Sequence, residues 1–470
     1  MSVPDFRSLT VQELARRVRD HELSAAEVTN AALERIDALN PTLNAFVAVN
    51  ADDARSQAAT IDRRLAAGED VGPLAGIPIG VKDLEDAKGF VTSRGSLVTG
   101  GRDPASADST EVARLRAAGC VVLGKTNTPE AGWIGDTYNP VFGATLNPWN
   151  VERSPGGSSG GTSSAIASGM VPLATGSDGG GSIRIPSALT GMSGHKPSQG
   201  RVPGGPAPMG AGDLSTVGPM ARRIRDVALA LDVVAGPAPG DLRSLDAPAR
   251  SYREALADPH APKRVLWAPS IEGQAPDSEI HGVCRAAVDR IADAGVEVVE
   301  VGPVFEDLMG PFALLFYGGM VPVFREAMND PAQFAMVTPG LQEILSVADG
   351  ILTPDSVETA RSQAQALSIG LAETMAGFDA LLSPTVAGQT PVSERNGTID
   401  GEETTAWVSY TYGFNVTRRP AGTTNAGFTA DGMPVGLQIV GHQLDDLGTL
   451  VTTAWIEDLL GFDPIAPDLG

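Results

Sequence analysis

The chain has 470 residues, of which 42% are hydrophobic and 19% are charged, a composition typical of folded globular proteins rather than disordered ones. Its 57 Asp and Glu residues against 34 Lys and Arg residues give a formal net charge of -23. This charge repels phosphate backbones and anionic membrane surfaces, so we expect no nucleic-acid partner and no membrane partner.

Helical patterns dominate residues 1–70, which we interpret as an N-terminal scaffold. Residues 24–27, Ser-Ala-Ala-Glu, fit the capping box that satisfies free amide groups at the start of a helix. Pro41 is predicted to end that helix, because proline lacks the N–H group that a helix interior needs. Another helix is expected over residues 52–68.

From residue 71 apolar strands alternate with helices, a pattern typical of an α/β fold. The first of these strands is predicted to end at Lys82. The remaining predicted elements, in chain order, are a helix at 109–119, a strand at 120–127, a Gly- and Ser-dense region at 154–205, a helix at 221–236, a strand from 264, a helix at 284–295, a strand from 296, an apolar helical region at 303–375, a strand near 380 and two strands within 426–441 joined by a turn at 431–432.

No internal repeat and no long linker divides these elements. We therefore predict a single large α/β/α domain over residues 1–470, with a central twisted mixed β-sheet flanked by helices. Within it, residues 75–240 are predicted to form the catalytic core, and residues 303–375 a helical region that lines either the core or a substrate pocket.

Two cysteines, Cys120 and Cys284, are too few for a disulfide framework or a zinc site, and their apolar surroundings predict buried thiols. The first residues lack the pattern of a secretory signal. The longest apolar stretch, residues 312–324, is interrupted by Gly and Pro and is shorter than the roughly 20 residues that a transmembrane helix needs. These features predict a cytoplasmic protein without a bound metal.

Residues 176–186, GSDGGGSIRIP, place Ser182 directly after three glycines, an arrangement typical of an exposed nucleophile. No histidine lies within twelve residues of it, and none of the five histidines has a spaced partner that suggests a triad or a metal site. Lysine remains as a base, because burial can lower its pKa toward neutrality. Lys82, at the end of an apolar strand, fits this role, although a salt bridge to Asp83 or Asp86 is the alternative interpretation.

Two other functions of the glycine-rich segments, an α/β-hydrolase nucleophile turn and a phosphate-binding loop, do not match the surrounding sequence. Residues 156–160 satisfy the G-x-S-x-G pattern of α/β-hydrolases, but the polar, proline-broken segment before them is no strand. A phosphate-binding loop would require a Gly-Lys-Ser/Thr sequence, which follows neither glycine-rich segment.

The segments SPGGSSGG at 154–161 and GSDGGGSIRIPSA at 176–188 closely resemble the amidase signature hydrolases. The resemblance extends over nearly the whole chain, and it includes PLAGIPIGVKD around Lys82, GKTNTPE at 124–130, NPVFGATLNPWN at 139–150, HKPSQGRVP at 195–203, GPMARRIRDVALALDVVAG at 218–236 and GMPVGLQIVG at 432–441.

This resemblance implies a catalytic set of a serine, a second serine and a lysine, in the amidase signature fold. It assigns Ser182 as the nucleophile, Ser158 as the bridging serine after a cis peptide bond, and Lys82 as the base. The further residues implied are Gly179, Gly180 and Gly181 in the oxyanion hole, with Asp178, Arg184 and Ser159 in support. The sequence departs from the family at Arg418 and Arg419, where Gly and an apolar residue are usual. We expect both to lie on the surface, and the alternative is that an arginine reaches the substrate cleft and holds a carboxylate or a carbonyl there.

Three functions fit these residues. A hydrolase of a small apolar or aryl carboxamide, with carbamates and esters as further substrates, is favoured because residues 303–375 are rich in Phe, Leu and Met. The alternatives are a glutamine-hydrolysing amidotransferase subunit of a tRNA-dependent complex and a non-catalytic binding relative. We expect a small-molecule amide as the partner, no cofactor, and leave a homodimer open.

Overall fold

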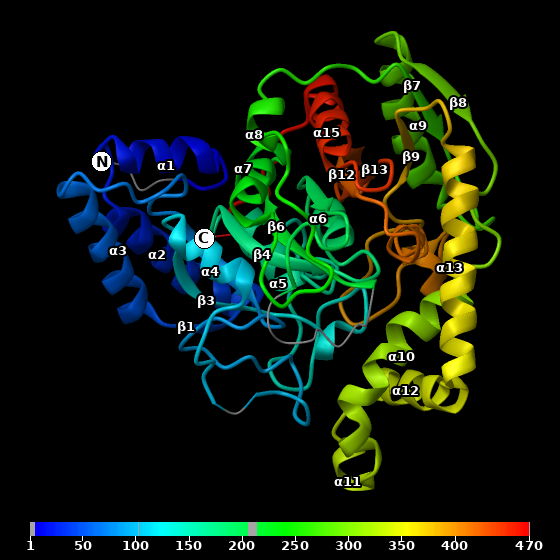
Figure 1. Ribbon diagram of the computed structural model, residues 1–470, viewed down its shortest axis with the longest axis horizontal. Helices are drawn as coiled ribbons and strands as arrows, with labels where there is room; N and C mark the ends of the chain where they lie inside the picture. The colour runs from blue at the N-terminus through cyan, green and yellow to red at the C-terminus, as the bar shows by residue number, and fades with distance from the viewer. Residues whose placement is uncertain (1–4, 102, 205–213, 470) are drawn as a thin grey trace.

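Two mixed β-sheets with helices packed on them form the framework of the protein (Figure 1). The structure is a computed structural model that describes residues 5–101, 103–204 and 214–469. The first sheet has five strands in the order β1-β3-β2-β4-β6, and the second has six in the order β5-β12-β13-β9-β7-β8. This architecture confirms the predicted α/β class with mixed β-structure flanked by helices, but the strands form two sheets where one central sheet was predicted.

The strands and helices have the following bounds. In the first sheet these are β1 (Phe46–Val49), β2 (Pro78–Lys82), β3 (Val121–Thr126), β4 (Leu173–Asp178) and β6 (Thr216–Ala221). In the second they are β5 (Gly194–Lys196), β7 (Arg264–Trp267), β8 (Glu297–Glu300), β9 (Ala380–Pro384), β12 (Ala421–Phe428) and β13 (Pro434–Val440), while β10 (Thr398–Ile399) and β11 (Glu402–Glu403) form a separate ribbon. The helices are α1 (Val11–Arg19), α2 (Ala25–Leu43), α3 (Ala51–Ala66), α4 (Thr110–Ala117), α5 (Gly160–Ala167), α6 (Arg184–Leu189), α7 (Ile224–Val234), α8 (Tyr252–Ala255), α9 (Ser278–Asp293), α10 (Met309–Met328), α11 (Pro331–Phe334), α12 (Pro339–Ile351), α13 (Pro354–Thr374), α14 (Gly413–Val416) and α15 (Asp446–Leu460).

Helix α2 begins as predicted but ends later than predicted. Both hydrogen bonds of the capping box at Ser24 and Glu27 are present. Pro41 does not end the helix, which continues to Leu43 and stops at Asn44 in a left-handed conformation with φ 49°. Pro41 is exposed and lies in the last turn, where its missing N–H group costs a single hydrogen bond and buried Leu43 still anchors the helix.

The parallel pairing of β2 with β4 brings two chemically important strand ends to one edge of the first sheet. Ile79 and Gly80 of β2 pair with Leu173 and Ala174 of β4. The carboxyl ends of both strands therefore lie side by side, with Lys82 as the last residue of β2 and the glycine-rich loop directly after β4. In open α/β sheets such an edge is where ligands bind.

The Gly- and Ser-dense region at 154–205 contains more regular structure than its composition predicts. It holds α5, β4, α6 and β5, all of them buried. Its small residues are required by close packing: a Cβ atom on Gly161 would lie 2.2 Å from the backbone nitrogen of Asn127. Hydrophobic periodicity cannot reveal elements whose buried positions are filled by serine, threonine and glycine.

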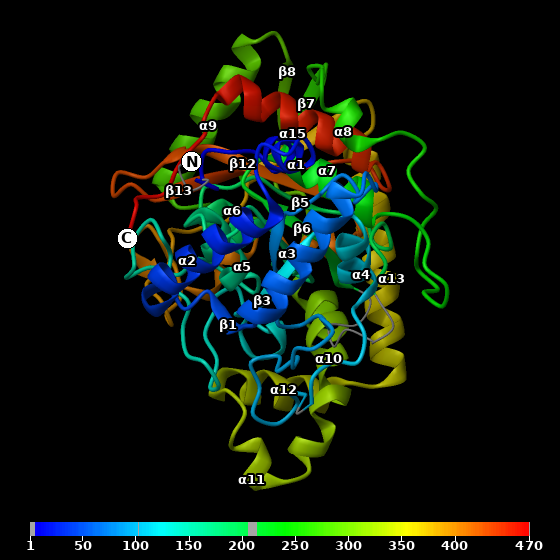
Figure 2. The same ribbon diagram turned by 90° about the vertical axis from the view of Figure 1, so that its left-hand side faces the viewer.

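The predicted helical region at 303–375 is confirmed as helices α10 to α13. In Figure 1, α13 runs from the other three helices up to the second sheet, and its buried Leu371 belongs to the same core cluster as Leu266 of β7 and Leu381 of β9. Turning the molecule by 90° shows α11 and α12 at the end opposite β8 (Figure 2). Cys120 and Cys284 are buried free thiols, as expected. Within the described ranges, no helix combines the length and the apolar character needed to cross a membrane.

Candidate active site

Lys82, the last residue of β2, is wholly buried among three serine hydroxyls. Its Nζ lies 2.8 Å from the Oγ atoms of Ser158 and of Ser159, and 2.9 Å from that of Ser177. Burial lowers the pKa of Lys82 to about 7, although the Asp178 and Glu85 carboxylates act to raise it. A neutral amine has a lone pair and only two hydrogens, so one of the three hydroxyls donates to it.

The alternative salt bridge of Lys82 is not formed. Asp83 instead pairs with Lys125, whose Nζ lies 3.3 Å from its Oδ1, and Asp86 accepts a hydrogen bond from Thr92. Lys82 is therefore free to interact with hydroxyl groups alone.

Ser158 and Ser159 reach Lys82 from the start of α5. The Gly157–Ser158 peptide bond is cis, as the resemblance implied. Gly132 covers Ser158 closely, since a Cβ atom at Gly132 would lie 3.2 Å from the Ser158 Oγ. Ser159 also approaches the backbone carbonyl of Ser177 at 3.3 Å, which ties the start of α5 to strand β4.

Ser182 follows the glycine-rich loop after β4 and lines a cavity. The residue is 8% exposed. Its Oγ makes no hydrogen bond with any described residue. The structure thus joins Lys82 to Ser158, while a Ser158–Ser182 hydrogen bond is not present among the described residues. Gly181 has φ 128° and packs against Thr411, whose Oγ1 would lie 2.3 Å from an added Cβ atom, so only glycine fits there.

The amides of the glycine-rich loop are not equivalent. The Gly181 N–H group donates to Asp178 Oδ1 at 2.7 Å. The N–H groups of Gly179 and Gly180 make no hydrogen bond within residues 5–101, 103–204 and 214–469. Two of the three predicted oxyanion-hole residues therefore have free amide donors next to Ser182.

A buried ion pair between Asp178 and Arg184 fixes the shape of this loop. Both side chains have 0% exposure, and Arg184 Nη2 lies 2.9 Å from Asp178 Oδ1. Burial acts to raise the pKa of Asp178, but Arg184 outweighs it and holds this pKa well below its usual range. Arg184 also donates to Gln438 Oε1 at 2.7 Å and to Asn415 Oδ1 at 2.6 Å. The loop is thereby tied to β13 and α14.

Asp178→Asn is expected to lower the free energy of unfolding by about 3–5 kcal/mol, because it leaves the buried Arg184 charge without its partner. Urea denaturation of the purified protein measures this change. The control is Asp431→Asn in the exposed pair with Arg153, for which we expect at most about 1 kcal/mol. Equal, small losses in both variants would contradict a structural role for the buried pair.

Sequence reasoning missed three residues of the site, Ser177, Asn415 and Gln438. Ser177 lies on β4, a strand that was not predicted. Gln438 is a polar residue inside the apolar strand β13, and a polar residue in such a position was the available signal. Asn415 becomes a contact of Arg184 only through the fold, across 231 residues.

The expectation that Arg418 and Arg419 both lie on the surface is half correct. Arg418 is exposed, with φ 56°. The prediction is wrong for Arg419, which is only 2% exposed and therefore buried in the protein. Neither residue lines the cavity next to Ser182.

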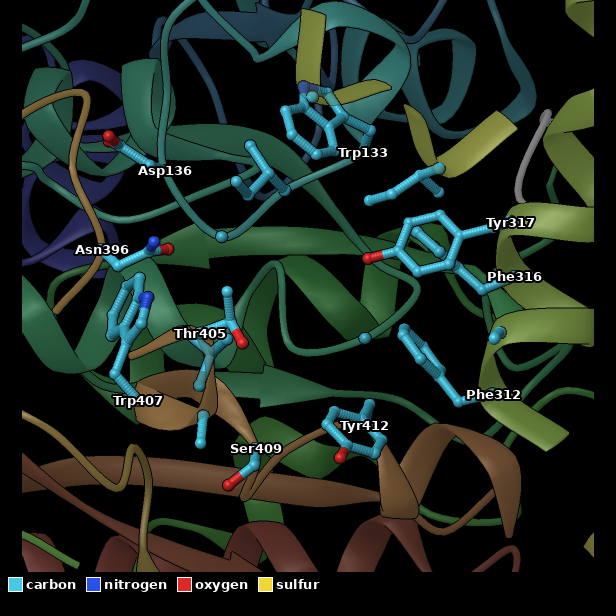
Figure 3. Close-up of a pocket in the computed structure, with 18 of the residues that line it drawn as sticks. Trp133, Asp136, Phe312, Phe316, Tyr317, Asn396, Thr405, Trp407, Ser409 and Tyr412 are labelled. Atoms are coloured by element: carbon cyan, nitrogen blue, oxygen red, sulfur yellow. The ribbon is translucent and has the colours of Figure 1, made fainter. Parts of the chain in front are cut away.

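The cavity that Ser182 lines has a volume of about 960 Å³. Figure 3 shows the side chains around it. One side, which we call the aromatic wall, consists of Phe312, Phe316, Tyr317 and Tyr412. The facing side carries Asn396, Thr405, Trp407 and Ser409, and Trp133 lies at a third side. Helix α10 supplies the first three residues of the aromatic wall, and so the region at 303–375 does line the cavity.

Carboxylates dominate the charged groups of this cavity. They belong to Asp136, Glu272, Glu343, Glu394 and Glu403. Arg395 is the one cation among the described lining residues, and its Nη2 lies 2.6 Å from Glu403 Oε2. The described part of the chain also contains no cluster of three or more His, Cys, Asp or Glu residues that could hold a metal ion.

Known proteins share both the sequence and this architecture. The Amidase family profile matches residues 27–450. An acylamidase of Rhodococcus erythropolis is 36% identical, with 97% of this chain and 96% of the relative covered. A glutamyl-tRNA(Gln) amidotransferase subunit of Salinispora arenicola is 35% identical, with 98% and 99% covered. The crystal structure of a bacterial aryl acylamidase superposes with a TM-score of 0.88 at 28% identity, with 96% of each chain covered. The chain therefore belongs to the amidase signature family and is an amide-hydrolysing enzyme.

Proposed function

We propose that this enzyme hydrolyses the C–N bond of a small carboxamide with an apolar or aryl acyl group, through a covalent acyl-enzyme on Ser182. The observation that carries the proposal is the position of Ser182 beside the aromatic wall of the cavity. Aromatic side chains stack on apolar and aryl groups, and a mostly apolar cavity of this size suits a small organic ligand.

Neutral Lys82 is the base in the proposed first step. Its lone pair accepts the Ser158 hydroxyl proton, and Ser158 in turn accepts the proton of Ser182. The Ser182 Oγ then forms a bond to the substrate carbonyl carbon, whose oxygen becomes an oxyanion. The mechanism requires a Ser158–Ser182 hydrogen bond that is absent before substrate binds, and catalytic hydrogen bonds often tighten only in the substrate complex.

The free amides of Gly179 and Gly180 are the proposed donors to the oxyanion. Fixed N–H groups stabilise developing negative charge because they need no reorganisation during the reaction. When the intermediate collapses, the C–N bond breaks and the proton returns from Lys82 through Ser158 to the leaving nitrogen. Water then attacks the Ser182 ester by the same route and releases the carboxylic acid. Carbamates and esters fit the same acyl chemistry.

The charges of the cavity argue against the second candidate, a glutamine-hydrolysing amidotransferase subunit. Free glutamine carries an α-carboxylate, which requires an available cation. Arg395 is already paired with Glu403, and the other charged lining residues are acids. The acids suit the α-ammonium of glutamine, but the described lining residues leave no unpaired cation for its α-carboxylate, whereas an uncharged amide needs none.

The purified chain alone is expected to release an aniline from an aryl acyl anilide and no ammonia from glutamine. Chromatography of both reactions measures the two products. Ammonia release from glutamine that requires an added partner protein, without anilide cleavage, would overturn the proposal in favour of an amidotransferase component.

A further inference from the structure

The aromatic wall contains a polar atom that no other described residue engages, the hydroxyl of Tyr317. The second hydroxyl of the wall, that of Tyr412, donates to Glu272 Oε2 at 2.9 Å. Tyr317 has no such partner in the described chain, and Figure 3 shows its oxygen pointing into the cavity. A phenylalanine would form the same wall without this oxygen.

The ring of Tyr317 is held in place by its neighbours on α10. It packs edge-on against Phe312, with ring centroids 5.7 Å apart and planes at 76°, and against Phe316, at 5.1 Å and 80°. The hydroxyl therefore has a fixed direction. Burial raises the pKa of Tyr317 to about 12, so the phenol keeps its proton near neutral pH and remains a donor.

The Tyr317 hydroxyl is placed to contact a substituent of the substrate rather than the reacting carbonyl. Phe312 packs directly on the glycine-rich loop, since a Cβ atom at Gly180 would lie 2.9 Å from its Cζ. Tyr317 packs on Phe312 in turn. A ring that stacks on the aromatic wall with its carbonyl at Ser182 would thus extend a substituent toward the Tyr317 hydroxyl.

The charges around the cavity define the group that Tyr317 can bind. Half-buried Glu272 and exposed Glu343 and Glu394 surround the site, and Arg395 is paired. An anionic acceptor would be repelled, so the acceptor is uncharged. A substituent that covers the hydroxyl without accepting its hydrogen bond leaves a desolvated donor, which disfavours that substrate.

We infer that Tyr317 is a specificity-determining residue, whose hydroxyl donates a hydrogen bond to an uncharged acceptor oxygen on the apolar group of the amide substrate. This inference rests on the proposed function, because it takes the cavity as the amide-binding site. It adds that the preferred substrates are apolar amides that carry a carbonyl-like oxygen away from the scissile bond.

The test compares anilides whose rings carry either a para-acetyl or a para-isopropyl group, which have similar shape but differ in the acceptor oxygen. One pair carries the group on the acyl ring and the other on the amine ring. Binding is measured by calorimetry in Ser182→Ala and in Ser182→Ala/Tyr317→Phe, and kcat/KM in the parent and in Tyr317→Phe. We expect Tyr317→Phe to weaken binding and lower kcat/KM by about tenfold for the acetyl member of one pair, and by less than about twofold for its isopropyl partner.

Tyr412→Phe is the matched control, because its hydroxyl is already engaged by Glu272 and its removal should not change the ratio between the members of a pair. An equal effect of Tyr317→Phe on both members, no effect on either, or no binding of any of the four compounds would overturn the inference. If Ser182→Ala binds with the expected ratio but the parent cleaves none of the compounds, the proposed reaction fails while the role of Tyr317 stands.

Discussion

Replacing Ser182 with Ala is expected to lower kcat by roughly 10⁶-fold, the loss typical of removing a serine nucleophile that acts together with its base. The hydroxyl lines the cavity and has no structural hydrogen bond among the described residues, so its removal should leave stability unchanged. Turnover of an aryl anilide measures the first effect and thermal unfolding the second. Labelling by a fluorophosphonate, which requires the nucleophilic oxygen, should disappear as well.

A second buried serine provides the control for this variant. Ser198 is 0% exposed, its Oγ has no hydrogen-bond partner among the described residues, and it does not line the cavity. Ser198→Ala should therefore keep both turnover and fluorophosphonate labelling. Labelling that persists in Ser182→Ala would place the nucleophile elsewhere in the chain.

Replacing Lys82 with Arg is expected to lower kcat/KM by roughly 10³-fold, within the range that general base catalysis supplies. Arginine keeps its proton at any working pH, so it cannot accept one from Ser158. The exposed residue Lys88 offers a control, since Lys88→Arg changes the same chemical group on the surface. Substantial activity in Lys82→Arg would show that a fixed positive charge, rather than proton transfer, is what position 82 supplies.

The pH dependence of kcat/KM in the parent enzyme should reflect the ionisation of Lys82. Lys82 must be neutral to act, and it is neutral above its pKa, which burial lowers to about 7. The rate constant kcat/KM should therefore fall as the pH drops below about 7 and should level off above it. A profile that still climbs at pH 10 would mean that the lysine keeps an ordinary pKa.

Those parts of the fold and site that depend on local pattern could be predicted from the sequence. An apolar run ending in a charged residue indicated β2 and Lys82, and three glycines before Ser182 indicated the loop. The resemblance implied that Asp178 and Arg184 support this loop, and in the structure they form a buried ion pair beside it.

Features that depend on distant contacts could not be predicted in this way. Strand β4 is buried, but four of its six residues are Thr, Gly, Ser and Asp, so hydrophobic periodicity did not indicate a strand there. The position of Ser177 beside Lys82 could therefore not be predicted. Arg419 was assigned to the surface because arginine usually lies there, and the fold overrides this preference. The cavity is lined by α10 and by the segment 394–412, which is far along the chain. No local sequence pattern indicates that these two segments lie close together.

Helix α10 lies far along the chain from β2, α5 and the loop after β4, so two proposed tasks belong to different parts of the sequence. In the proposed mechanism, proton transfer depends on β2, α5 and the loop after β4, whereas the aromatic wall of the cavity comes largely from α10. We therefore expect mutations of α10 residues that do not touch the glycine-rich loop, such as Tyr317, to change which amides are accepted while Lys82 and Ser158 stay in place. Such an arrangement favours evolutionary diversification.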